Sequence, residues 1–170
     1  MLDEIFLLIK ALGEPEYLYL LLEPAFIYGI GIALVVFVAG FLLRDGKAQM
    51  LGLVMLIVSS LMIVPYLAFR AEAAERIESV YKLDNPATLK AFKAQSKRYQ
   101  DSKWAYVTLG GVAGAVLLVG AGTNRVGFTL AVVTVIAGTG VVLFSLSMHL
   151  KEAQIHHPNL LAIKPINATG

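Results

Sequence analysis

Residues 25–43, AFIYGIGIALVVFVAGFLL, decide the class of this protein. The stretch carries no charge. At about 1.5 Å per helical residue it is long enough to cross the roughly 30 Å hydrocarbon layer of a bilayer. It ends at a polar turn, Arg44-Asp45-Gly46-Lys47, and a second apolar run extends from Met50 to Phe69. A turn this short predicts that the two runs pair as an antiparallel hairpin.

The second half of the chain has the same outline. A third run goes from Trp104 to Ala121, and a fourth goes from Val126 to Met148 after the turn Gly122-Thr123-Asn124-Arg125. None of the four runs contains Asp, Glu, Lys, Arg or His. The sequence therefore predicts an all-α membrane protein with four transmembrane helices arranged as two antiparallel hairpins, 25–69 and 104–149.

Composition supports this class and excludes others. Hydrophobic residues make up 58% of the chain and charged residues 15%, whereas about a quarter of a typical soluble domain is charged. Cysteine is absent, which removes disulfides and thiolate metal sites. The net charge of +2 comes from dispersed residues, so nucleic-acid binding has no support. No nucleophile elbow, phosphate-binding loop or zinc helix occurs, and we expect no enzymatic activity.

Three further segments flank the hairpins. Residues 1–24 predict a short interfacial helix that lies in the membrane plane or on a partner, followed by a bend or break near Pro24. Residues 70–103 predict a helical connector in which Asp84-Asn85-Pro86 ends one helix and starts the next. The basic second helix suits either lipid headgroups or packing on protein, including the rest of this chain. Residues 150–170 predict an extended tail that docks on a partner.

Three histidines near the end of the fourth span are the candidate ligands. His149, His156 and His157 could bind haem, a chlorophyll or bacteriochlorophyll, or a metal through their imidazoles. The alternative is a purely structural role near the membrane surface, because no acid or cysteine accompanies them at ligand spacing. Glu23 is either an interfacial acid or a contact to a partner subunit or quinone headgroup.

Small residues four apart mark close helix packing. Gly110 and Gly114 in the third span have this spacing, which lets helix backbones approach. They pack within the bundle or form a groove for a lipid, pigment or quinone. Trp104 stands at the start of the span, where an aromatic ring is typical of the membrane interface, and is a candidate lipid or partner contact.

The order of hairpin, charged connector and second hairpin, with Pro24 just before the first span, resembles an uncharacterised bacterial four-helix membrane domain. That domain is sometimes fused to Rieske-type iron–sulfur domains. The resemblance covers roughly residues 23–148. The family typically has His-Pro where this chain has Glu23-Pro24, so no functional residue is carried over. The resemblance implies an energy-transducing complex as the setting.

These observations predict a non-catalytic accessory subunit of a larger membrane complex, with electron-transfer and photosynthetic complexes as candidates. The partners would be other membrane subunits and lipids. The alternatives are a haem- or pigment-binding membrane protein, and a small channel or carrier. Most Lys and Arg residues lie on the face with the termini and connector, whereas Arg44, Lys47 and Arg125 lie opposite. The positive-inside rule then places the termini and connector in the cytoplasm, most simply at a bacterial inner membrane.

Overall fold

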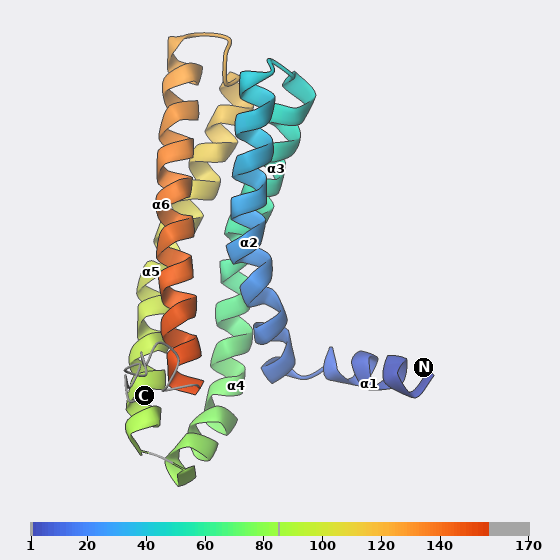
Figure 1. The fold of residues 1–170 in the computed structure, drawn as a ribbon, viewed down its shortest axis with the longest axis vertical. Helices are drawn as coiled ribbons and strands as arrows, with labels where there is room; N and C mark the ends of the chain where they lie inside the picture. Colours follow the sequence, from blue (N-terminus) through green and yellow to red (C-terminus); the bar gives the residue numbers. More distant parts are fainter. Residues whose placement is uncertain (1, 85, 157–170) are drawn as a thin grey trace, which may run out of the picture.

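The computed structural model describes residues 2–84 and 86–156 and contains six helices in that part of the chain. They are α1 (Leu2–Ala11), α2 (Pro15–Leu42), α3 (Gly46–Leu61), α4 (Ile63–Asp84), α5 (Pro86–Val119) and α6 (Arg125–His156). Figure 1 shows α2 to α6 as a long upright bundle, with α1 projecting sideways from its lower end. The bundle contains no strand within the described residues.

Four helical segments are long and apolar enough to cross a membrane: Pro15–Leu42, Gly46–Ala74, Pro86–Val119 and Arg125–Gln154. The chain is therefore an integral membrane protein, and the predicted pair of hairpins is confirmed. α2 packs mainly on α3 and α4, α5 packs on α6, and the hairpins meet where α3 and α4 pack on α5 and α2 packs on α6. With α3 and α4 taken together as one span, each of the four spans thus packs on two others around a shared core.

The turn between α2 and α3 is built from backbone caps. Arg44 has a φ of 56°, and the Asp45 N–H donates to the Gly40 carbonyl at 2.9 Å. This is the six-to-one bond of a Schellman ending. The Asp45 carboxylate then accepts from the Lys47 N–H at 2.9 Å and caps α3. The helix reversal is therefore encoded locally by residues 40–48.

The two prolines inside helices differ in effect. Of the bend or break predicted near Pro24, the break does not occur: α2 continues through this residue, because burial of Glu23, Phe26 and Ile27 holds the helix on its neighbours. Pro65 follows an interruption at Met62, where the helix divides into α3 and α4. A proline lacks the N–H that would bond four residues back, which explains why the helical pattern fails there.

The connector joins the bundle instead of lying beside it. Pro86 starts α5 as predicted, but this helix continues to Val119 and so includes both the second half of the connector and the third span. Phe92 and Tyr99 are fully buried against the rest of the chain. Of the two alternatives for this basic helix, the structure shows packing within the chain. Asn85, the expected cap, lies outside the described residues.

Candidate functional site

A buried cluster of charged and aromatic side chains occupies the lower half of the bundle. Its centre is Arg70 on α4, which is only 2% exposed. The guanidinium donates through Nη2 to Oε1 of Glu152 at 3.0 Å, through Nη1 to Oη of Tyr66 at 2.9 Å, and through Nε to Oγ of Ser96 at 3.1 Å. Three helices, α4, α5 and α6, are therefore joined through one side chain.

Aromatic rings enclose the same guanidinium. Its central carbon lies 4.8 Å from the ring centroid of Phe92, 5.2 Å from Tyr99, 5.5 Å from Tyr19 and 5.9 Å from Tyr66. A cation at these distances is attracted by the ring faces, and the attraction grows when water is excluded. The rings thus compensate part of the cost of burying Arg70.

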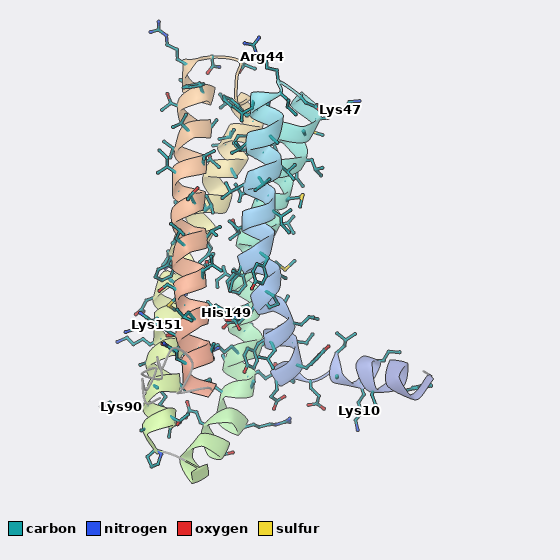
Figure 2. The ribbon with its side chains drawn as sticks, viewed as in Figure 1. Lys10, Arg44, Lys47, Lys90, His149 and Lys151 are labelled. Atoms are coloured by element: carbon teal, nitrogen blue, oxygen red, sulfur yellow. The ribbon has the colours of Figure 1, made fainter. Side chains whose placement is uncertain are left out.

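A second acid lies next to this cluster. Glu23 on α2 is 4% exposed, and its Oε1 accepts from Oη of Tyr99 at 2.7 Å. The same oxygen lies 3.2 Å from Nδ1 of His149 on α6, whose side chain is 45% exposed. Figure 2 shows His149 within the lower half of the bundle. With Glu23 ionised, the contact requires the His149 proton on Nδ1, because a carboxylate only accepts.

The charges of the cluster nearly cancel. Arg70 carries one positive charge against the two carboxylates of Glu23 and Glu152, so the sum is zero when His149 is protonated and −1 when it is neutral. Buried ions are costly to desolvate, and pairing plus hydrogen bonds offsets that cost. Within the part of the chain that the structure describes, Arg70 is thus compensated by nearby carboxylates, and His149 is the partly exposed member of the cluster.

Other polar contacts extend the connection between α5 and α6. Oη of Tyr106 lies 2.7 Å from Oγ of Ser145, and Nε2 of Gln95 donates to the Met148 carbonyl at 2.9 Å. All four residues are buried. Buried polar groups that are mutually satisfied fix the register of the helices that carry them.

A group of exposed ion pairs lies at the same end of the bundle as the Arg70 cluster. Nη1 of Arg76 is 2.9 Å from Oε1 of Glu16 and 3.2 Å from Oε2 of Glu14. The negative charge of Glu16 is the main cause of a raised pKa of the Arg76 guanidinium, and Glu14 adds to it. Because the group is exposed to solvent, it orients the start of α2 without contributing much stability.

The structure brings together two of the residues predicted from sequence, Glu23 and His149, in one contact. His156 is the last residue of α6, and its side chain and all of His157 lie outside the described residues. Trp104 is 66% exposed, with Nζ of Lys103 5.5 Å from its ring centroid. Among the described residues, no group of three or more His, Cys, Asp or Glu side chains could hold a metal.

The two glycines predicted as contacts differ. A Cβ placed on Gly110 would lie 3.5 Å from Cβ of Ser60, so this glycine packs α5 on α3. A Cβ placed on Gly114 would meet no atom within 4 Å. Gly110 therefore belongs to the packed core, and Gly114 borders open space.

Sequence reasoning missed Arg70, Glu152 and the tyrosines around them. Arg70 directly follows an apolar run and begins the predicted connector, where a charge is ordinary. A signal was nevertheless present, because Tyr19 and Glu23, and likewise Tyr66 and Arg70, stand four apart on one helix face. Both pairs lie at the end of their spans that faces the connector.

Comparison with protein-family models, curated proteins and solved structures finds no match for this chain. The resemblance to the bacterial four-helix domain therefore stays a prediction. Functional conclusions rest on the geometry of the cluster and the surfaces of the bundle.

Proposed function

We propose that this chain is a non-catalytic structural subunit of a larger membrane assembly. The closely packed interior of the bundle supports this most directly. The buried ions around Arg70 pair with one another, and one turn further along the helices the fully buried rings of Phe26, Tyr66 and Tyr106 pack edge to face. Such an interior stabilises one arrangement of helices and leaves the outer surfaces for function.

The same packing disfavours the channel or carrier alternative. Ring centroids are 5.0 Å apart for Phe26 and Tyr66 and 5.5 Å apart for Phe26 and Tyr106. These are ordinary distances for aromatic pairs in a protein core. An aqueous path through the centre of the bundle would have to displace these side chains, so we do not propose one.

The surface of α1 is where we place the contact to a partner. Phe6, Leu7 and Ile9 are 71%, 67% and 60% exposed, and the helix projects away from the bundle (Figure 1). The family resemblance favours an energy-transducing complex as the assembly, with electron-transfer and photosynthetic complexes as the candidates.

Purification of the tagged chain in mild detergent tests this proposal. The native chain should bring down a stoichiometric partner, and the double variant Phe6→Ser, Ile9→Ser should lose it while its thermal unfolding stays unchanged. The conservative variant Phe6→Leu, Ile9→Leu is the matched control and should keep the partner. A monodisperse native monomer would contradict the proposal.

A second candidate function is haem or chlorophyll binding at His149. Nδ1 of this histidine is held by the Glu23 carboxylate, and a histidine oriented in this way commonly offers Nε2 to a metal. An apolar groove of about 540 Å³ lies on the neighbouring seam of α2 and α6, between residues that include Ile27 and Leu146. This combination suits a flat apolar macrocycle.

An absorption spectrum of the purified chain tests the second candidate. We expect haem or pigment bands that His149→Ala abolishes and that Glu23→Gln shifts. The variant His156→Ala, His157→Ala is the matched control and should leave the bands unchanged. Absent bands, or bands that survive His149→Ala, remove this candidate.

We also propose a bacterial inner-membrane location with the connector in the cytoplasm, as the distribution of Lys and Arg favours. Because the chain lacks cysteine, single cysteines report this cleanly. In intact cells an impermeant maleimide should label Lys47→Cys and not Lys90→Cys. The reverse pattern would overturn the orientation. Figure 2 labels both lysines, at opposite ends of the bundle.

A further inference from the structure

A groove of about 420 Å³ lies between α5 and α6 towards the lower end of the bundle. Its walls combine apolar, hydroxyl and charged side chains from Arg98, Asp101, Ser102, Phe144, Ser147, Met148 and Lys151. We propose that this groove binds the headgroup of an anionic phospholipid. Arg98 and Lys151 are the cationic partners of the phosphate, and Ser147 supplies a hydroxyl donor. The Ser102 hydroxyl donates to the Tyr99 carbonyl at 2.9 Å and forms part of the wall.

The groove straddles the level at which the hydrocarbon layer ends. Measured along the helices at 1.5 Å per residue, Phe144 lies about 29 Å from the upper end of α6 at Arg125. Lys151 lies about 39 Å from the same end, and Arg98 about 32 Å from the upper end of α5 at Val119. Hydrocarbon is about 30 Å thick. The apolar wall therefore meets the acyl chains, and both cations lie at headgroup depth.

The two cations are available to a ligand. Arg98 and Lys151 are exposed, and neither makes an ion pair within residues 2–84 and 86–156, whereas Arg70 and Lys93 each have a carboxylate within 3.0 Å. Figure 2 shows Lys151 on the outer surface of the bundle. Asp101 is the acid of the groove, which leaves one net positive charge. A basic pocket between transmembrane helices at this depth is typical of anionic headgroup sites.

The native chain carries its own reporter. Trp104 is the single tryptophan, is exposed, and follows Asp101 by nearly one helical turn on α5. Its fluorescence in reconstituted vesicles is quenched by brominated lipid bound next to it. Vesicles of phosphatidylcholine with brominated phosphatidylglycerol, or with brominated phosphatidylcholine, therefore give the relative binding constants of the two lipids.

We expect phosphatidylglycerol to bind about five-fold more tightly than phosphatidylcholine at this position. The double variant Arg98→Gln, Lys151→Gln should reduce the ratio to near one, and the charge-retaining variant Arg98→Lys, Lys151→Arg should preserve it. The matched control Lys47→Gln, Arg125→Gln removes two cations at the other end and should also preserve it.

Three results would overturn the proposal. Equal quenching by the two lipids in the native chain would remove the preference itself. A preference that survives Arg98→Gln, Lys151→Gln would place it elsewhere on the protein. Reversal of the quenching by glycerol phosphate in solution would assign the groove to a soluble phosphate.

Discussion

Nη2 of Arg70 and Oε1 of Glu152 meet at 3.0 Å, although 82 positions separate the two residues in the chain. α4 belongs to the first hairpin and α6 to the second, so this buried ion pair joins the hairpins at one end of the bundle. Removing one partner of a buried pair leaves an uncompensated charge, which typically costs about 3–5 kcal/mol.

We therefore expect Glu152→Gln to lower the free energy of unfolding by about 3 kcal/mol, measured by SDS titration in mixed micelles. Lys93→Ala removes a more exposed pair, in which Nζ lies 3.0 Å from Oε2 of Glu78, and should cost less than about 1 kcal/mol. Equal losses in the two variants would contradict the role assigned to the buried pair.

Tyr99→Phe should destabilise the bundle through Glu23. The substitution keeps the ring beside Arg70 and removes the 2.7 Å hydrogen bond to the buried carboxylate, a loss of about 1–3 kcal/mol. Tyr28 is 53% exposed, so Tyr28→Phe is the control and should change stability by less than about 0.5 kcal/mol. The same SDS titration distinguishes them, and an unaffected Tyr99→Phe variant would show that Glu23 does not need this donor.

Gly52→Ala should separate α2 from α3. A Cβ at Gly52 would lie 2.5 Å from the backbone nitrogen of Phe37, which cannot move without shifting α2, so we expect a loss of about 1–3 kcal/mol. At Gly31 a Cβ would meet no atom within 4 Å, and Gly31→Ala should be neutral or stabilising. Thermal unfolding in detergent tests the two variants. A neutral Gly52→Ala would contradict the close approach of α2 and α3 at this glycine.

Arg44→Gly should stabilise the upper turn. Arg44 adopts a φ of 56°, a conformation that glycine adopts without strain, and the expected gain is about 0.5–1 kcal/mol. Lys47→Gly, three residues later in the first turn of α3, should instead cost up to about 1 kcal/mol. A shift of the melting temperature in the same direction for both variants would refute this account of the turn.

The spans and turns were predictable because their signals are local. An apolar run bounded by Arg44-Asp45-Gly46-Lys47 identifies a helix end wherever the partner helices lie, and Pro86 marks a helix start by its own chemistry. The break considered at Pro24 was wrong because burial on both sides of the proline holds α2 together. Tertiary packing overrode the local signal there.

The cluster around Arg70 was not predictable in the same way. Its members come from α2, α4, α5 and α6, and no spacing within one segment reports that Arg70 faces Glu152 or that Glu23 faces His149. A charge at the end of an apolar run is usually solvated. Arg70 is buried because it pairs with side chains on other helices, and those pairings are known only once the helices are packed.

The unbroken course of α5 has a mechanical consequence. At about 1.5 Å per residue its 34 residues form a rod roughly 51 Å long, without a proline or glycine break between Pro86 and Leu109. In the first hairpin, by contrast, the second span is interrupted at Met62, between the end of α3 and the start of α4. A force on the outer end of α5 is thus transmitted along an uninterrupted helix, while the α3–α4 span lacks one backbone hydrogen bond at that point because Pro65 has no N–H.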